Sequence, residues 1–379
     1  METTIPITCS NCYDHQDTQE SCICGHIIAC GGGADHKDKG GVHGLRKNVR
    51  RLFHGKASSN SSDVNSSSVA TASFKKSSLG KLTSWPSVEI PATPAAACGG
   101  SNKRALLCGV TYSHQHRYKL KGTANDVSNM KNLLTNTFGY PAECIRILSE
   151  DDPYAQDLIP TKKNIENSLK WLVEGCKRGD SLVFYFSGHG LRQPDFQGDE
   201  IDGYDETICP VDFMKEGMIL DNDINKTIVL PLKEGVTLHA IVDACHSGTI
   251  LDLEHVYNRK QKTWINNSPP SGVRKSTSGG LAISISACED DKMAADTTVF
   301  TKKIMNGAMT YVLTETVKRN PQITYGALLD TMASDIENIN SERWIKSRII
   351  RKVFRHKTIQ EPMLSSSSKF EVYDKKFIL

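Results

Sequence analysis

Apolar and polar positions alternate regularly from about residue 103 to the end of the chain. Short apolar runs rich in β-branched residues are bounded by turn-forming residues, which is typical of strands buried on both faces. Between them lie stretches with apolar residues at helical spacing. The predicted strands are 104–110, 144–149, 181–190, 236–243, 280–287 and a terminal strand at 370–379, and the predicted helices lie within 125–139, 161–180, 221–232, 300–319 and 325–338.

Strands that alternate with helices predict an α/β fold with a parallel or mostly parallel sheet and helices on both of its faces. Residues 250–280 are polar and rich in Pro, Ser and Gly, which predicts a loop. The fold class expected for residues 101–379 is therefore a mostly parallel β-sheet flanked by helices.

Residues 1–100 differ in kind from the rest. Gly, Ser, Ala, Thr and Asn dominate there, and such segments bury too little apolar surface to offset the entropy of ordering them, so we expect disorder. The spacing of cysteines within 9–36 suggests a zinc site, although the second pair is irregular and unpaired cysteines in a loose tail are the alternative. The candidate ligands are Cys9, Cys12, Cys22 and Cys24.

Composition narrows the class of protein. The 379-residue chain has a net charge of +3, too small to favour nucleic acid as a partner, although 46–56 is a short basic run. No apolar stretch is long enough to cross a membrane, and the N-terminus resembles no secretory signal. Twelve cysteines spread over a long chain then indicate reduced thiols and a cytoplasmic or nuclear protein.

The candidate chemistry lies where two predicted strands end. SLVFYF runs into His189, and VTLHAIVD runs into Cys245. If the strands are parallel neighbours, their carboxyl ends converge and the imidazole can activate the thiol as a nucleophile. The backbone N–H groups of Gly190 and Cys245 are candidates for an oxyanion hole.

These strand ends resemble a known family. SGHG (187–190) and DACHSG (243–248), in this order, are similar to the histidine and cysteine boxes of metacaspases in the caspase-like clan. GTANDV, DGYDETICPVD, LDNDIN and SISACEDDKMAAD also match, so the resemblance covers roughly residues 103–379. The Ser/Gly-rich N-terminal segment and the short stretch between the cysteine box and SISAC are similar to the plant type I class.

The resemblance implies a caspase-like fold and a division of the chain. Residues 1–100 would be a prodomain that holds a degenerate zinc finger, and 101–379 a catalytic domain. Within the latter, 103–255 would be the large-subunit part, 256–279 a linker and 280–379 the small-subunit part. The family acts mostly as a monomer on protein or peptide substrates, and it is associated with programmed cell death and stress.

The family implies cleavage after Arg or Lys, and three residues agree with it. By resemblance, Asp126, Ser187 and Asp243 form the pocket for the basic side chain. Asp243 and Ser187 each lie two residues before a catalytic candidate and so on the same face of a strand. Two carboxylates and a hydroxyl would hold a guanidinium and repel an acidic side chain. The alternative is that Asp126 caps its helix and Asp243 is paired internally.

An acidic loop at 198–206 suggests a cation, because so many carboxylates repel one another otherwise. Calcium takes six to eight oxygen ligands and is the physical candidate, with a solvated loop as the alternative. By resemblance to calcium-activated metacaspases, the ligands would be Asp205, Asp221, Asn222 and Asp252.

A peptidase specific for basic residues would find cleavage sites in its own linker. The candidate positions are Arg259, Lys260, Lys262, Arg274 and Lys275. The sequence thus predicts a calcium-stimulated, self-processing cysteine endopeptidase. A non-catalytic scaffold of the same fold, and a zinc-dependent nucleic-acid-binding protein resting on the first 56 residues, are the alternatives.

Overall fold

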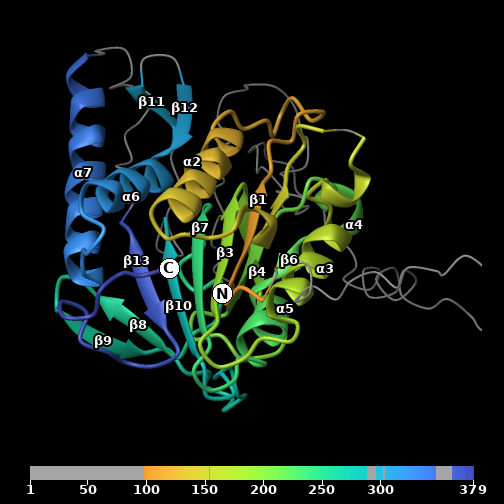
Figure 1. Ribbon diagram of the computed structural model, residues 1–379, viewed down its shortest axis with the longest axis vertical. Coiled ribbons are helices and arrows are strands. Elements are labelled where there is room, and N and C mark those ends of the chain that lie inside the picture. The colour runs from red at the N-terminus through yellow and green to blue at the C-terminus, as the bar shows by residue number, and fades with distance from the viewer. Residues whose placement is uncertain (1–97, 99, 153, 288–295, 302–303, 347–360) are drawn as a thin grey trace, which may run out of the picture. The chain divides into compact units, whose positions relative to one another are not determined.

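The computed structural model describes residues 98, 100–152, 154–287, 296–301, 304–346 and 361–379 (Figure 1). The chain divides into two units, Met1–Ile90 and Pro91–Leu379, and every described residue belongs to the second. The four candidate zinc ligands and the basic run at 46–56 therefore lie outside the described residues. No helix among the described residues is both long and apolar enough to cross a membrane.

An eight-stranded sheet forms the centre of the second unit. Five strands run parallel at one side, and three antiparallel strands complete the other side. In spatial order the strands are β2 (Ile145–Leu148), β1 (Lys103–Gly109), β3 (Ser181–Ser187), β7 (Thr237–Asp243), β10 (Leu281–Ser286), β13 (Met363–Ser366), β8 (His255–Asn258) and β9 (Thr263–Asn266). The predicted mostly parallel sheet is confirmed.

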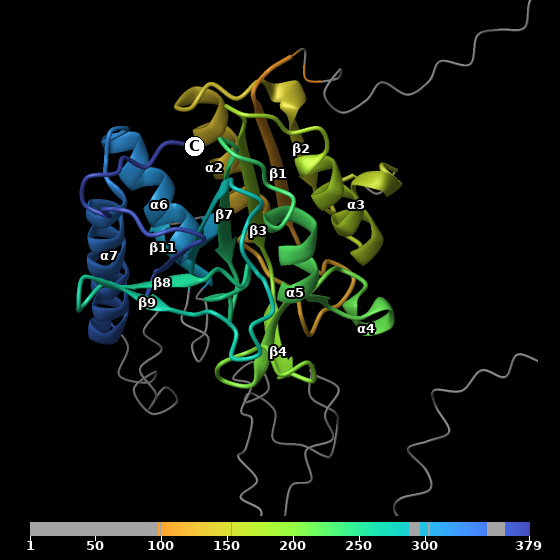
Figure 2. The same cartoon turned by 90° about the horizontal axis from the view of Figure 1, so that it is seen from below.

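Helices cover both faces of the sheet, as the alternation of elements predicts (Figure 2). On one face lie α2 (Thr123–Asn136), α6 (Ala308–Arg319) and α7 (Tyr325–Lys346), whose buried residues join one core with alternate residues of β1, β3, β7 and β10. On the other face lie α3 (Lys162–Val173), α5 (Asp221–Ile224) and the π-helical turn Asn225–Val229. Strands buried on both faces must be apolar on both, and Leu106, Leu107, Phe184 and Tyr185 are indeed fully buried.

Smaller elements lie beyond the carboxyl ends of the central strands. A three-stranded antiparallel sheet contains β4 (Gly190–Pro194), β5 (Tyr204–Ile208) and β6 (Ile219–Leu220). A separate hairpin joins β11 (Asp296–Thr301) to β12 (Ile304–Gly307). The remaining elements are the short helix α4 (Phe213–Glu216), the 3-10 turn Gln156–Leu158 and, at the amino end of β2, the 3-10 turn Ala142–Cys144. Because β4 follows β3 almost directly, the residues around His189 are fixed by two sheets.

Three predictions from the sequence are wrong in detail. Residues 250–280 are not simply a loop, because β8 and β9 form a hairpin that extends the main sheet. Aromatic contacts hold it, since the ring centroid of Trp264 lies 5.2 Å from those of Tyr257 and Phe370. The helix expected from residue 300 begins at Ala308, after β11 and β12.

The third correction concerns the predicted terminal strand at 370–379. Within it only one isolated bridge forms, between Lys376 and Thr324. Leu364, Ser365 and Ser366 occupy the sheet instead, in the short strand β13. A strand of only four residues, half of them serine, carries too weak an apolar pattern to be recognised.

Candidate active site

Strands β3 and β7 are parallel neighbours, and their register continues to the last residue of each. Ser187 pairs with Asp243 at the carboxyl edge. His189 and Cys245 each follow two residues later, so the structure brings the two candidate catalytic segments together. The approach is close, because a Cβ on Gly190 would stand 2.1 Å from the carbonyl oxygen of Cys245. Only glycine fits at that position.

The imidazole of His189 is oriented by two tyrosines. Its Nε2 lies 2.8 Å from the carbonyl oxygen of Tyr118. Its backbone N–H donates to the hydroxyl of Tyr112 at 3.0 Å, and the two rings lie 4.8 Å apart. Burial lowers the pKa of His189, and the hydrogen bond to Tyr118 opposes this shift. The ring is therefore held in place and favoured in its neutral form.

Sequence reasoning missed the support behind these tyrosines. Tyr112 is fully buried with φ of 52°, and its hydroxyl donates to the carbonyl oxygen of Cys209 at 2.7 Å. The carboxylate of Glu150 accepts hydrogen bonds from the backbone N–H groups of Thr111, Tyr112 and Ser113 at 2.6–2.7 Å. Tyr112 follows β1 and Glu150 follows β2 at the same carboxyl edge of the sheet. Their place after predicted strands was the signal in the sequence that could have indicated a role at the site.

Cys245 differs from the other described cysteines in its exposure. Cys98, Cys108, Cys144, Cys176 and Cys209 are buried, whereas Cys245 is half-buried. Burial raises the pKa of Cys144 to about 12, which keeps such a thiol protonated and unreactive. Among the described cysteines, the thiol at the end of β7 is thus the one suited to meet a substrate.

The turn that presents Cys245 is tight. His246 adopts φ of 49°, a left-handed conformation that costs a non-glycine residue roughly 1–2 kcal/mol. The hydroxyl of Ser247 donates to the carbonyl oxygen of Ala244 at 2.9 Å and fixes the turn. Strain of this kind persists where the surroundings determine the backbone, and it is frequent at active sites.

The three residues predicted to recognise a basic side chain lie together and are buried. The hydroxyl of Ser187 donates to Oδ2 of Asp126 at 3.0 Å. Both carboxylates also converge on Gly307, where a Cβ would stand 2.3 Å from Oδ2 of Asp243 and 2.9 Å from Oδ2 of Asp126. Two acidic groups and a hydroxyl therefore share one location beside the strand ends, and glycine leaves space between the carboxylates.

The junction of β12 and α6 binds both carboxylates. The backbone N–H of Gly307 donates to Asp126 at 2.9 Å, and the N–H and hydroxyl of Thr310 donate to Oδ2 of Asp243 at 2.9 and 2.7 Å. The N-cap residue of α2 is Gly122, so Asp126 does not occupy that position but lies within the first turn of the helix. Internal pairing of Asp243 is real, and the two donors from Thr310 are neutral, so they leave its negative charge in place.

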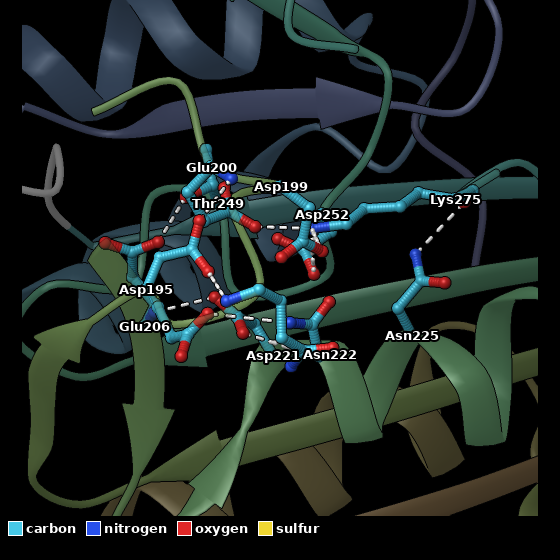
Figure 3. Close-up of polar contacts among 12 residues, drawn as sticks. Asp195, Asp199, Glu200, Glu206, Asp221, Asn222, Asn225, Thr249, Asp252 and Lys275 are labelled. Atoms are coloured by element: carbon cyan, nitrogen blue, oxygen red, sulfur yellow. Dashed lines mark hydrogen bonds and ion pairs between the residues drawn. The ribbon is translucent and has the colours of Figure 1, made fainter. Parts of the chain in front are cut away.

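Carboxylates from the segment between β4 and β5, from β5, from the start of α5 and from the turn that follows β7 gather in two groups (Figure 3). Oxygen atoms within each group lie within 4.8 Å of one another. The first group is Asp195, Asp199 and Asp205, and the second is Glu200, Asp221 and Asp252. We call these six residues the acidic cluster. The predicted calcium ligands divide between the groups, and Nδ2 of Asn222 bridges toward Asp205 at 3.5 Å.

A lysine from the presumed linker enters the acidic cluster. Nζ of Lys275 lies 3.0 Å from Asp199 and 3.0 Å from Asp252, and it also donates to Glu200. Lys275 is only 4% exposed. Burial and the charge of Asp252 raise the pKa of Glu200 to about 8, and burial raises the pKa of Asp252 to about 6 despite Lys275. The cluster thus contains more carboxyl groups than one ammonium can keep ionised.

The donor atoms of the acidic cluster fit a calcium ion. All are hard oxygens. Oδ1 of Asp252 and Oδ1 of Asp199 are buried and have no hydrogen-bond partner among the described residues. Glu200, which lies with Asp221 and Asp252, is not among the four predicted ligands, because a run of carboxylates in a loop does not tell which of them point inward.

The acidic cluster is connected to the loop that carries Cys245. The hydroxyl of Thr249 donates to Glu206 at 2.7 Å, and the backbone N–H of Glu206 donates to Asp221 at 2.6 Å. Asp252 ends the same loop, with φ of 50°. A change of charge in the cluster therefore acts directly on Asp252, seven positions beyond the thiol, and through Glu206 on Thr249, four positions beyond it.

The candidate cleavage positions differ in accessibility. Lys260, Lys262 and Arg274 are exposed, whereas Arg259 is partly buried and pairs with Glu361 at 3.0 Å. Lys275 contradicts the expected flexible linker, because its side chain is buried in the acidic cluster.

Comparison with known proteins finds relatives of this chain. The family model described as "Metacaspase, peptidase C14 domain" matches residues 103–254. Metacaspase-1 of Arabidopsis thaliana is 46% identical over 292 residues, which is 73% of this chain and 78% of that protein. Metacaspase-1 of Meyerozyma guilliermondii is 35% identical, over 71% of this chain and 70% of that protein. The crystal structure of caspase-1 from Spodoptera frugiperda matches with a TM-score of 0.44 and 12% identity, over 79% of this chain and 97% of that one.

Proposed function

This chain belongs to the metacaspase family of caspase-like cysteine peptidases, and we propose that it is a calcium-stimulated endopeptidase that cleaves after Arg or Lys. The observation that carries the proposal is the in-register end of β3 and β7, which delivers His189 and Cys245 to one edge with a buried acidic pair beside them. Neither a scaffold nor a nucleic-acid-binding protein requires that arrangement.

The proposed mechanism begins with the tautomer of His189. A carbonyl oxygen accepts hydrogen bonds and donates none, so the contact with Tyr118 favours a proton on Nε2 and leaves Nδ1 basic. Nδ1 takes the proton of the Cys245 thiol, and the thiolate attacks the scissile carbonyl carbon. The proton then passes to the leaving amine, and water hydrolyses the acyl-enzyme. N–H groups of Gly190 and Cys245 would stabilise the oxyanion.

Specificity for Arg or Lys is supported by charge. Asp126 and Asp243 are buried carboxylates whose assigned donors, Gly307 and Thr310, are neutral. A substrate guanidinium or ammonium would add charge-assisted hydrogen bonds that these neutral donors do not provide. An acidic substrate side chain would meet repulsion instead, so proteins and peptides with a basic residue before the scissile bond are the proposed substrates.

Calcium stimulation is supported by the acidic cluster. Glu200, Asp221 and Asp252 would hold the ion, with Asp205 and Asn222 nearby. When bound, calcium would supply positive charge that neutralises the cluster. Thr249 and Asp252 would then be fixed more firmly, and with them the loop that carries Cys245. This proposed set of calcium ligands adds Glu200 to the four residues expected from the sequence.

Self-processing and cellular role complete the proposal. A zymogen would cut itself in the segment that follows β8, and the exposed Lys260, Lys262 and Arg274 are the favoured positions. A monomer in the cytoplasm, and also in the nucleus, that acts in programmed cell death or the stress response is the proposed setting. Zinc binding by the N-terminal cysteines stays a separate proposal, to be tested by metal analysis of the whole chain.

A fluorogenic peptide that ends in Arg tests the function. We expect hydrolysis that increases with calcium and disappears in Cys245→Ala. The Asp243→Ala variant should lose its preference for Arg over an uncharged residue. If the folded wild-type chain hydrolyses no peptide at any calcium concentration, the protease proposal is wrong and a scaffold is favoured. If Asp243→Ala keeps full preference for Arg, the pocket is assigned incorrectly.

A further inference from the structure

Lys275 occupies an unusual position for a lysine. Its ammonium group is surrounded by carboxylates from the acidic loop and from the turn after Cys245 (Figure 3). Lysine is almost never fully buried unless it is paired, because removing its charge from water is costly. Its side chain is 4% exposed, and Asp199 and Asp252 are 3% and 2% exposed. The contacts are therefore a built ionic site and not a surface ion pair.

The site is held from the backbone as well. Nδ2 of Asn225 donates to the carbonyl oxygen of Lys275 at 3.0 Å and to that of Leu251 at 2.8 Å. Asn225 thereby joins the segment after β9 to the residue just before Asp252. Arg274 next to it points to solvent and hydrogen-bonds only within its own turn in the contacts assigned to it, to Ser276 and Thr277. Of the two neighbouring basic residues, only Lys275 is used by the cluster.

The ammonium and a calcium ion need the same oxygen atoms. Calcium binds oxygens at about 2.3–2.6 Å and uses six to eight of them. Asp252 and Glu200 belong to the cluster that fits the ion, and both bind Nζ of Lys275. Two cations on the same carboxylates would repel each other in a buried site. Occupancy by one therefore excludes the other.

We propose that Lys275 is a tethered competitor of the activating cation: its ammonium fills the acidic cluster in the calcium-free chain, and calcium binding expels it into solvent. The proposal rests on the calcium part of the proposed function. It names a regulatory role for a residue that the sequence marked only as a cleavage position. The concentration of calcium needed for activation is then set by the strength of the Lys275 ion pairs as well as by the ligands.

Expulsion would also change the segment that Lys275 belongs to. Residues 267–274 carry exposed or half-buried side chains and no regular element. Release of the Lys275 side chain removes its contacts with Asp199, Glu200 and Asp252 at once. The segment would then be held to this side of the fold by neutral hydrogen bonds, from Asn225 to the carbonyl oxygen of Lys275 and, at either end, from Asn267 to Glu254 and from Ser278 to Leu230. Calcium would therefore make Lys275 accessible to any reagent or enzyme that recognises a free lysine.

Amine labelling tests the expulsion on the native side chain. The whole chain carrying Cys245→Ala, which prevents self-cleavage, is treated with an acetylating reagent with and without calcium and analysed by mass spectrometry. We expect Lys275 to be protected without calcium and to be labelled at least about tenfold faster with it, within the range of ordinary coupling between sites. Lys260, exposed in either state, is the internal control. Equal labelling of Lys275 in both conditions, in a chain that binds calcium, overturns the proposal.

Calcium affinity tests the competition independently. On the same Cys245→Ala chain, Lys275→Met should bind calcium at least about tenfold more tightly, by calorimetry, because the competing charge is gone. Arg274→Met, one residue away and exposed, should leave the affinity unchanged. If Lys275→Met folds poorly without calcium, the measurement is made on Lys275→Arg instead. Arginine keeps the positive charge but does not reproduce the contacts of the ammonium with the acidic cluster. A calcium affinity that differs from that of the unsubstituted chain then supports competition. Unchanged affinity in a folded Lys275 variant contradicts it.

The two proposals fail in different ways. If the wild-type chain hydrolyses no peptide, the protease proposal is rejected, but the labelling of Lys275 and the calcium affinity can still be measured and interpreted. Hydrolysis without any calcium binding, by wild type and by Lys275→Met alike, would reject the competitor and the calcium stimulation but keep the peptidase. If Lys275→Met binds calcium and the wild type does not, the competitor proposal is supported, because the Lys275 ammonium of the wild type would then exclude calcium from the acidic cluster.

Discussion

Nε2 of His189 lies 2.8 Å from the main-chain carbonyl oxygen of Tyr118. A main-chain group cannot be lost by substitution of its side chain, and it stays neutral at every pH. The third member of the proposed catalytic arrangement is thus invisible to a search for side-chain motifs. Tyr118 itself is positioned by a hydrogen bond from its N–H to Gln115 and by ring contact with Phe213, at 5.5 Å between centroids.

The pH profile of hydrolysis follows from the burial of His189. Burial lowers its pKa below the ordinary value of 6.5, so the neutral, basic form persists to lower pH than for an exposed histidine. We expect kcat/KM to exceed half of its plateau at pH 6.5 and to fall only in more acidic solution. A titration of kcat/KM on an Arg peptide measures this. An acidic limb with its midpoint above 6.5 would mean that the imidazole is not desolvated as described.

Thr310 should control recognition of the basic side chain. Its N–H and hydroxyl orient Oδ2 of Asp243, and the hydroxyl also contacts that of Tyr185 at 2.8 Å. Thr310→Val keeps the shape but removes a hydrogen bond to a charged group, worth about 1.5–3 kcal/mol. We expect kcat/KM for an Arg peptide to fall about tenfold or more, mainly through KM. Thr310→Ser, which restores the hydroxyl, should recover most of it.

Gly190→Ala should disrupt catalysis through the backbone. The new Cβ would stand 2.1 Å from the carbonyl oxygen of Cys245, so one strand end must move. Displacement of a catalytic group by about 1 Å costs on the order of a hundredfold in rate. Gly272→Asn is the control, because that position is open and Asn tolerates its positive φ. Wild-type kinetics of Gly190→Ala would show that the two strand ends are less constrained than described.

His239 should make the fold sensitive to acid. Burial lowers its pKa from 6.5 to about 3, assisted by the positive charge of Lys375. The unfolded chain therefore binds a proton below pH 6.5 that the folded chain does not, and stability falls as the pH falls through this range. Between pH 6.5 and 5 the loss is about 2 kcal/mol. Urea unfolding of His239→Leu should show that much less acid sensitivity, whereas the exposed His114→Leu should behave as wild type. If the stability of the two variants is equally sensitive to acid, groups other than His239 cause the loss of stability.

Self-cleavage should follow exposure. Mass spectrometry of the wild-type chain, incubated with calcium, should find new ends after Lys260, Lys262 or Arg274, each of which is exposed. The Cys245→Ala chain should give none of them. Replacing those three residues by Gln should suppress the fragments and leave hydrolysis of a small peptide measurable. Identical fragments from wild type and Cys245→Ala would show that a contaminating protease makes the cuts.

Much of this arrangement could be inferred from the sequence, because it depends on local patterns. Apolar runs ending in SGHG and DACHSG place two strands and two functional groups without any knowledge of distant contacts. What could not be inferred depends on long-range contacts. Glu150 acts on Thr111, and Thr310 acts on Asp243, across 39 and 67 residues. Lys275 shows the same limit: a basic residue in a Ser/Gly-rich stretch has the composition of a loop, and only the fold reveals the carboxylates of Asp199, Glu200 and Asp252 around it.

The pairing of Ser187 with Asp243 also restricts how such a protein can change over evolution. Side chains alternate between the two faces of a strand. The loss or gain of one residue inside β3 or β7 would therefore move both the proposed catalytic residue and the pocket residue of that strand to the other face of the sheet. A point substitution alters one function at a time, but a length change alters both at once. Insertions and deletions in descendants of this gene should therefore accumulate between the strands, while the lengths of these two strands stay fixed.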